Sequence, residues 1–106
     1  MRTMLRWIAA IGVAGLLSAA GPARADYELV VKKNCLACHQ VDKRKYGPNF
    51  KEVAAKYADQ KNAAAVLAKK IRRGGTGVWG QDVMPPQPQV SAAEAKVLVN
   101  YILSLK

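Results

Sequence analysis

Two cysteines and a histidine stand within five consecutive residues of this chain, Cys35-Leu36-Ala37-Cys38-His39. In a helical segment, Cys35 and Cys38 share a face, and His39 lies about one turn after Cys35. Two thiols and one imidazole then converge. This C-x-x-C-H spacing is typical of covalent haem attachment, in which the thiols add to the two vinyl groups and the histidine binds the iron. The pattern predicts one haem c, attached through Cys35 and Cys38 and ligated by His39.

Three other kinds of site use the same residue types. Structural zinc takes four Cys or His ligands, and this chain holds only 2 Cys and 1 His. A thioredoxin-like thiol pair belongs beside a βαβ pattern, which the flanking sequence lacks. A disulfide between residues three apart closes a very small loop and stabilises little. Haem attachment is therefore the favoured interpretation, with zinc and a disulfide as alternatives.

The first 25 residues have the pattern of a secretory signal peptide. Arg2 and Arg6 precede an apolar run over residues 7–20, and Ala23-Arg24-Ala25 supplies small residues for cleavage. The run of 14 residues is shorter than the roughly 20 that span a bilayer as a helix. We therefore expect cleavage after Ala25, export to the periplasm and no stable membrane insertion afterwards. An uncleaved anchor is the alternative.

Cleavage there leaves residues 26–106 as one domain of 81 residues. This range keeps 14 of the 17 Lys and Arg and all 7 Asp and Glu, so its formal charge is +7. A basic surface, including Lys32, Lys33 and residues 43–45, speeds encounter with acidic partners. No recognition motif or aromatic ladder accompanies the charge, so nucleic acid is not an expected partner. A core this small commonly needs an additional stabilising element, such as a disulfide or a bound metal, and a covalent haem would provide one.

Helical signals recur along residues 26–106, and no segment alternates apolar and polar residues, so the predicted fold class is all-α. Asn49 with Glu52, and Ser91 with Glu94, form capping boxes. Asn62 is the expected N-cap of another helix, which Gly74-Gly75 ends. The expected helices cover residues 27–34, 50–57, 63–73 and 92 to near the C-terminus. The apolar stripes of the last two are predicted as Ala63, Val66, Leu67 and Ile71, and as Ala95, Leu98, Val99 and Ile102.

Residues 74–90 form a long loop of 17 residues that holds 4 Gly and 3 Pro, and a loop this long in a small domain needs a purpose. Met84 within it is the one methionine of residues 26–106, which contain no other His or Cys outside the motif. Pro85 and Pro86 stiffen the backbone, which can hold a thioether at a fixed distance from a metal. Met84 is therefore the expected second axial ligand. A core methionine and a lysine ligand are the alternatives.

With these motifs, the chain resembles the small class I bacterial cytochromes c, the short periplasmic monohaem carriers of the c-551/c-552 type. The resemblance rests on five features in the same order. They are C-L-A-C-H, Tyr46-Gly47-Pro48, Gly77-Val78-Trp79-Gly80, Val83-Met84-Pro85-Pro86 and the capped C-terminal helix. It covers essentially all of residues 26–106. It implies the cytochrome c fold, with four to five short helices around one covalently bound haem.

The resemblance also implies roles for two further residues. The carbonyl of Pro48 would accept a hydrogen bond from the Nδ1–H of His39, which orients such a ligand. The indole N–H of Trp79 would be directed at a haem propionate. After Met-Pro-Pro the family often continues with Asn, whereas this chain has Gln87. That difference bears on the orientation of Met84 at the iron.

Together, the residues and the resemblance predict a soluble electron carrier and not an enzyme. His/Met ligation fills both axial positions and raises the reduction potential, so the iron would pass single electrons by Fe(II)/Fe(III) cycling. The expected protein is a monomer whose partners have acidic docking patches. The resemblance suggests a nitrite reductase or terminal oxidase and an upstream quinol-oxidising complex. The alternatives are a haem enzyme or gas sensor with an open sixth position, and a subunit docked in a larger redox complex.

Overall fold

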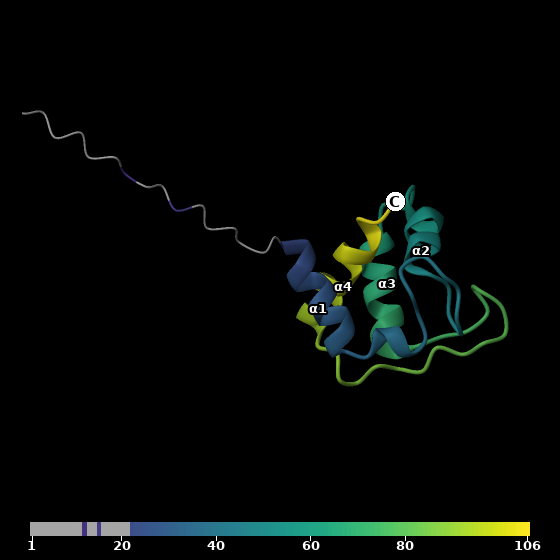
Figure 1. The fold of residues 1–106 in the computed structure, drawn as a ribbon. Helices are drawn as coiled ribbons and strands as arrows, with labels where there is room; N and C mark the ends of the chain where they lie inside the picture. The colour runs from purple at the N-terminus through teal and green to yellow at the C-terminus, as the bar shows by residue number, and fades with distance from the viewer. Residues whose placement is uncertain (1–11, 13–14, 16–21) are drawn as a thin grey trace, which may run out of the picture.

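The computed structural model of the chain describes residues 12, 15 and 22–106 (Figure 1). In this part of the chain there are four α-helices, one short 3-10 helix and no strand. The elements are α1 (Pro22–Lys32), η1 (Cys35–Ala37), α2 (Phe50–Tyr57), α3 (Ala63–Arg73) and α4 (Ala92–Leu103). The predicted all-α class is confirmed. The predicted leader, residues 1–25, lies mostly outside the described residues. None of these helices has the length and apolar composition needed to cross a membrane.

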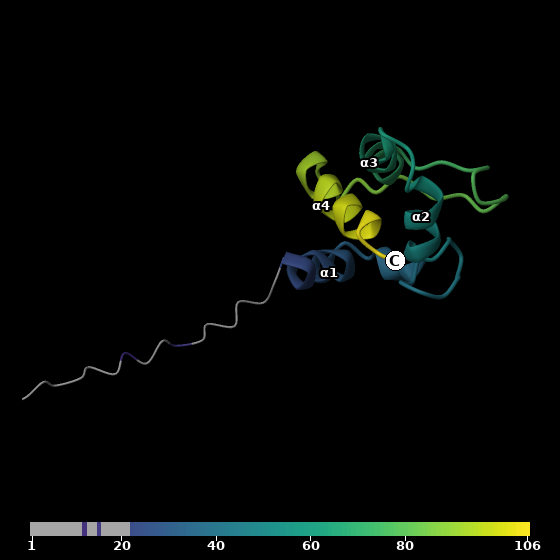
Figure 2. The ribbon, with the colours of Figure 1, turned by 90° about the horizontal axis from the view of Figure 1, so that it is seen from above.

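α4 is the helix around which the others are arranged. It packs against α1, α2 and α3, and it lies between α1 and α3 in the view from above (Figure 2). Its start is fixed by the predicted capping box, because the Ser91 hydroxyl accepts from the Glu94 N–H at 3.1 Å and the Glu94 carboxylate accepts from the Ser91 N–H at 3.0 Å. The whole predicted stripe of this helix is buried: Ala95, Leu98, Val99 and Ile102.

α2 begins and ends at the predicted residues. The side chain of Asn49 accepts from the Glu52 N–H at 2.7 Å, and the Glu52 carboxylate accepts from the Asn49 N–H at 3.1 Å. This second capping box satisfies two backbone donors that the first turn of a helix leaves without partners. The helix therefore starts at Phe50, whose ring is buried beside the candidate site.

α3 also has the predicted bounds, but two details of its prediction are wrong. Asn62 makes no side-chain cap, because its backbone (φ −100°, ψ 15°) is not extended as an N-cap requires. The carbonyl of Gln60 instead accepts from the Ala63 N–H at 3.3 Å. On the predicted stripe, Ala63, Leu67 and Ile71 are buried, whereas Val66 is 36% exposed. Val66 lies at the margin of the stripe and remains accessible to water.

α1 differs from the prediction at both ends. It begins at Pro22, within the predicted leader, and ends at Lys32. Asn34 then adopts the left-handed conformation with φ 65° and ψ 25°, which asparagine tolerates better than most residues. This residue separates α1 from η1, so Cys35 begins a short 3-10 helix, and Cys38 follows its end, instead of both standing on a continuation of the first helix.

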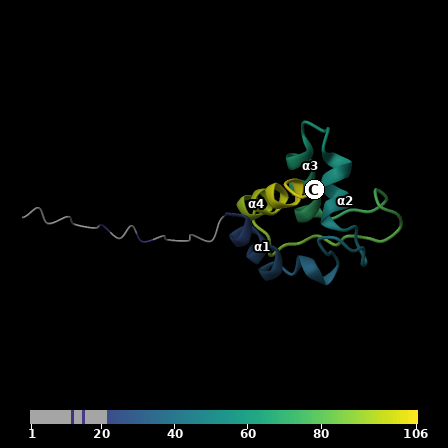
Figure 3. The same ribbon diagram turned by 45° about the horizontal axis from the view of Figure 1, so that its top comes forward.

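The hydrophobic core lies where α4 meets the other helices, and Val30, Leu98 and Val99 are fully buried in it. No polar or charged residue is buried among the residues described. The segment between α3 and α4 loops out past α2 and returns to the start of α4 (Figure 3). One face of the core is thus bordered by a long non-helical segment, and the candidate site lies there.

Candidate haem-binding site

A largely apolar cavity of about 620 Å³ lies between the helices and the segment that joins α3 to α4. Its volume falls in the range of about 300–1,000 Å³ that is typical of cofactor pockets. All six residues predicted for the site line it: Cys35, Cys38, His39, Pro48, Trp79 and Met84. Core side chains such as Leu98 and Ile102 form its inner wall. The fold therefore brings together residues that are far apart in the sequence.

The imidazole of His39 is held by a hydrogen bond to the backbone of the following turn. Its Nδ1 lies 2.8 Å from the carbonyl oxygen of Pro48, a buried residue. A carbonyl only accepts, so Nδ1 carries the proton and donates. The other ring nitrogen, Nε2, then has its lone pair free for a metal. This bond has the partners and the direction that the resemblance implies.

Gly47 has a structural role at the site that the sequence analysis did not assign. A Cβ at this position would collide with the His39 ring, including Nδ1 at 2.7 Å. The Gly47 N–H also donates to the carbonyl of Cys38 at 2.8 Å. The ring of Phe50 stacks with the same imidazole, with centroids 5.3 Å apart and planes at 24°. In the sequence, Gly47 was identified only as part of the Tyr46-Gly47-Pro48 motif, because its close approach to the His39 ring depends on the tertiary fold.

The segment that carries Met84 is pinned to the end of α3. Gly75 and Met84 form an antiparallel bridge, in which the Gly75 N–H donates to the Met84 carbonyl at 2.9 Å and the Met84 N–H donates to the Gly75 carbonyl at 2.8 Å. The Gln87 N–H donates to the Ile71 carbonyl at 3.1 Å. Gly74 has φ 73°, and a Cβ there would strike the Met84 carbonyl and the Pro85-Pro86 backbone. Gly74, the residue that follows α3, thus also allows the Met84 segment to approach the helix end.

Trp79 lies half-buried at the edge of the cavity, where two basic residues contact it. The guanidinium of Arg44 donates to the Trp79 carbonyl at 2.8 Å, and the Lys56 ammonium lies 5.3 Å from the centre of the indole ring. A cation over an indole face is a favourable contact. The tryptophan is therefore held between α2 and the loop of residues 42–46. Its expected hydrogen bond to a propionate stays a prediction.

Of the two cysteines, Cys35 is half-buried and Cys38 is exposed. Burial raises the pKa of the Cys35 thiol. Thiols that act as redox nucleophiles have lowered pKa values, so Cys35 lacks the environment of a thioredoxin-like pair. Residues 22–106 contain no group of three or more His, Cys, Asp or Glu side chains that could together hold a metal ion.

The comparisons with known proteins agree with this geometry. Residues 27–106 match the family model described as Cytochrome c. The chain is 51% identical to cytochrome c-552 of Nitrosomonas europaea, over 94% of this chain and 96% of the relative. It is 46% identical to cytochrome c-552 of Hydrogenobacter thermophilus, over 93% and 94% respectively. The crystal structure of wild-type Nitrosomonas europaea cytochrome c552 has 54% sequence identity and a TM-score of 0.74, covering 76% of this chain and 99% of that one.

This chain belongs to the cytochrome c family. Its fold is the cytochrome c fold, its cofactor is haem c and its class of activity is electron transport. The side chains at the cavity suit such a group, since two thiols and an imidazole with a free Nε2 stand beside apolar walls. In this cytochrome c, the residues around the cavity include side chains of the types that attach haem covalently and ligate its iron.

Proposed function

We propose that this cytochrome c is a periplasmic electron carrier with one haem, ligated by His39 and Met84 and attached through Cys35 and Cys38. In this role no catalytic acid, base or nucleophile is required. When bound, the haem supplies a one-electron Fe(II)/Fe(III) couple. Pro48 would hold the protonated Nδ1 of His39 and so present Nε2 to the iron. Trp79 would donate its indole N–H to a propionate.

One observation carries the proposal: the imidazole of His39 and the thioether of Met84 border the same apolar cavity, although 45 residues separate them. The two residues are held by separate hydrogen bonds. The His39 imidazole donates to the Pro48 carbonyl, and the Met84 backbone pairs with that of Gly75. Two fixed axial ligands leave little room for a substrate at the iron. This favours an electron carrier over a haem enzyme or gas sensor.

The location of the protein is proposed from the N-terminal pattern. Residues 26–106 make up 81 of the 106 residues. The match to the solved Nitrosomonas europaea structure spans a similar share of this chain, 76%, and 99% of that structure. The relative's length thus agrees with removal of the first 25 residues. Export to the periplasm would also place the chain where its two cysteines can receive haem.

The partners are proposed to be redox proteins with acidic docking patches, met by a monomer of this protein. Lys43, Arg44 and Lys45 are exposed on the loop that reaches Trp79 at the edge of the cavity. Lys33, also expected to attract partners, is instead paired with Glu94, and its side chain is only 16% exposed. The loop of residues 43–45 is therefore the main candidate for electrostatic attraction of a partner.

Absorption spectroscopy of the purified haem-loaded protein tests the axial ligands. We expect a pyridine assay to report haem c, the oxidised protein to show the weak long-wavelength sulfur-to-iron band, and the reduced protein to be unreactive with carbon monoxide. In Met84→Ala the band should disappear and carbon monoxide should bind. Val83→Ala is the matched control, because the Val83 side chain is 68% exposed. A wild-type protein with a high-spin spectrum that binds the gas readily would contradict the proposal.

A further inference from the structure

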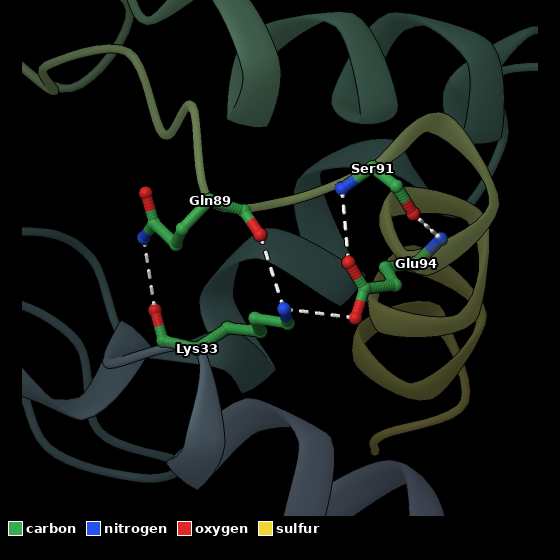
Figure 4. Close-up of polar contacts among 4 residues, drawn as sticks. All are labelled: Lys33, Gln89, Ser91 and Glu94. Atoms are coloured by element: carbon green, nitrogen blue, oxygen red, sulfur yellow. Dashed lines mark hydrogen bonds and ion pairs between the residues drawn. The ribbon is translucent and has the colours of Figure 1, made fainter.

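Two segments that lie 56 residues apart exchange side-chain hydrogen bonds beside the site (Figure 4). The Lys33 ammonium donates to the Gln89 carbonyl at 3.0 Å, and the Gln89 amide donates to the Lys33 carbonyl at 3.1 Å. The same ammonium is paired with the Glu94 carboxylate at 2.9 Å. Lys33 stands two residues before Cys35, and Gln89 follows the Met84 segment. The contact therefore joins the two halves of the candidate site.

The connection continues from Gln89 toward Met84. The Gln89 amide nitrogen donates to the side-chain oxygen of Gln87 at 2.7 Å, and the Gln87 amide nitrogen donates to the Pro85 carbonyl at 2.9 Å. The chain ends at two backbone carbonyls, those of Lys33 and Pro85, which can only accept hydrogen bonds. The amide nitrogens of Gln89 and Gln87 must therefore be the donors in every bond between them. The bonds thus form one consistent chain from the residue after Met84 to the residues before the cysteines.

The hydrogen bonds of Lys33, Gln87 and Gln89, which we call the strap, complement the other anchors of Met84. The bonds to Gly75 and Ile71 fix the Met84 segment to α3, which does not carry the cysteines or His39. Arg44 ties the loop at Trp79, five residues before Met84, to the half that carries the motif. The strap makes a second tie to that half on the other side, five residues after Met84. The segment of Met84 is thus tied to the half that carries the motif on both sides, at Trp79 and at Gln89.

We propose that Lys33 and Gln89 are positioning residues that keep Met84 at the iron by fixing its segment to the segment that carries Cys35 and His39. This rests on the proposed His39/Met84 ligation. If the strap is weakened, the Met84 segment keeps its bonds to α3 and the tie of Arg44 at Trp79, but the tie on the other side of Met84 is lost or loosened. The sixth position should then be open for a larger fraction of the time, without unfolding of the protein.

Imidazole binding to the oxidised haem-loaded protein measures that fraction, because an added ligand binds only when Met84 has left. Gln89→Ala removes both donor bonds of its amide, and Lys33→Ala removes those of the ammonium. We expect imidazole affinity to rise by at least about threefold to tenfold in each variant, the factor that corresponds to the loss of about one typical hydrogen bond within a protein. Lys33→Arg keeps the charge and the donors, so its affinity should return close to that of the wild type.

Two controls separate this effect from general destabilisation. Gln60→Ala changes an exposed glutamine in the turn between α2 and α3, away from the strap. Leu105→Ala trims a half-buried side chain after the C-terminal end of α4, opposite the end where the strap attaches. The thermal midpoint of Leu105→Ala should fall, while imidazole affinity in both controls stays at the wild-type value.

The outcomes distinguish the two proposals. If the wild type shows the sulfur-to-iron band but the strap variants bind imidazole no better than it does, the strap has no positioning role and Met84 ligation still stands. An equal rise in Leu105→Ala would also overturn the inference, since the effect would then follow stability alone. A wild type without the band would overturn Met84 ligation and with it the role of the strap.

Discussion

At the scale of single residues, the site depends on two positions that have no side chain, Gly47 and Gly74. The His39 imidazole can reach the Pro48 carbonyl because Gly47 has no side chain that would collide with the ring. Gly74 likewise leaves room for the backbone of the Met84 segment. The positive φ of Gly74 is a second reason for glycine at this position. Two of the contacts that position the proposed ligands therefore require glycine.

Replacing Gly47 with alanine tests this directly. The added methyl would collide with the imidazole, so we expect the haem-loaded Gly47→Ala protein to lose about 1–3 kcal/mol of unfolding free energy through overpacking. The displaced imidazole should also weaken the bond to Pro48 and alter the absorption spectrum. Thermal unfolding and the oxidised spectrum measure the two effects.

Gly75→Ala is the matched control for that change. A Cβ at Gly75 would contact the flexible end of the Lys70 side chain, which can move aside. Its stability and spectrum should stay close to those of the wild type. If Gly47→Ala and Gly75→Ala had the same thermal stability and the same oxidised spectrum, the close approach of Gly47 to His39 would contribute nothing to the stability or the spectrum.

At the scale of elements, local signals set the helix starts where a capping box is present. Asn49 and Ser91 have extended backbones and both bonds of the box, and α2 and α4 begin as the sequence indicates. Asn62 has the same residue type as Asn49 but a different backbone, so it makes no cap. Residue type alone does not decide capping, because the side chain reaches the N3 donor only from an extended N-cap residue.

The two asparagines form a matched pair for a stability measurement. Asn49→Ala should lower the unfolding free energy by about 0.5–2 kcal/mol, the usual cost of losing a side-chain cap. Asn62→Ala should change it by no more than about 0.5 kcal/mol, as expected for an exposed residue without such a bond. Urea unfolding midpoints of the two variants give the comparison. A loss in Asn62→Ala as large as that in Asn49→Ala would contradict the assignment of the caps.

At the scale of the whole molecule, Glu94 belongs to two structures at once. It closes the capping box of α4 and pairs with Lys33, so one carboxylate links α4 to the segment before the cysteines (Figure 4). The hydrogen bond from the Ser91 N–H, followed by the bond from Lys33, lowers the pKa of Glu94 to about 2. The carboxylate is thus held ionised in the folded protein well below its ordinary titration range.

This lowered pKa predicts how stability responds to acid. The folded-state value of about 2 lies below the ordinary value of 4.5, so the folded protein binds fewer protons than the unfolded chain between them. The stabilisation by Glu94 is therefore complete above pH 4.5 and is lost as the pH falls toward 2. Urea unfolding of the haem-loaded wild type and Glu94→Gln should differ most near neutral pH and converge in this acidic window.

Glu28→Gln is the control, because the partner of Glu28 in the structure is Arg24 of the predicted leader, at 3.7 Å with both side chains at least 70% exposed. Such pairs contribute little, so Glu28→Gln should follow the wild type at every pH. A difference between wild type and Glu94→Gln that persists unchanged to pH 2 would show that Glu94 does not stabilise the fold through its charge.

The all-α class, the bounds of α2 and α3, the start of α4 and the residue types that suit covalent haem attachment could all be predicted from the sequence. These follow from interactions within about four residues along the chain, such as Ser91 with Glu94, which act the same way in any fold. The count of ligands also depends on composition alone, which is why Met84 could be selected as the partner of His39 before its position was known.

Only the tertiary structure decided how those residues meet. It separated the cysteine motif from α1 at Asn34, set Gly47 against the imidazole and joined Gly75 to Met84. It also paired Lys33 with Gln89 across 56 residues. Each of these depends on how distant segments pack, and that packing is driven by burial of the core around α4, a non-directional force that does not specify individual contacts. The residue types that suit haem attachment and ligation could therefore be predicted from the sequence. Apart from the bond between His39 and Pro48, which the resemblance implied, the contacts that hold these residues in place could not.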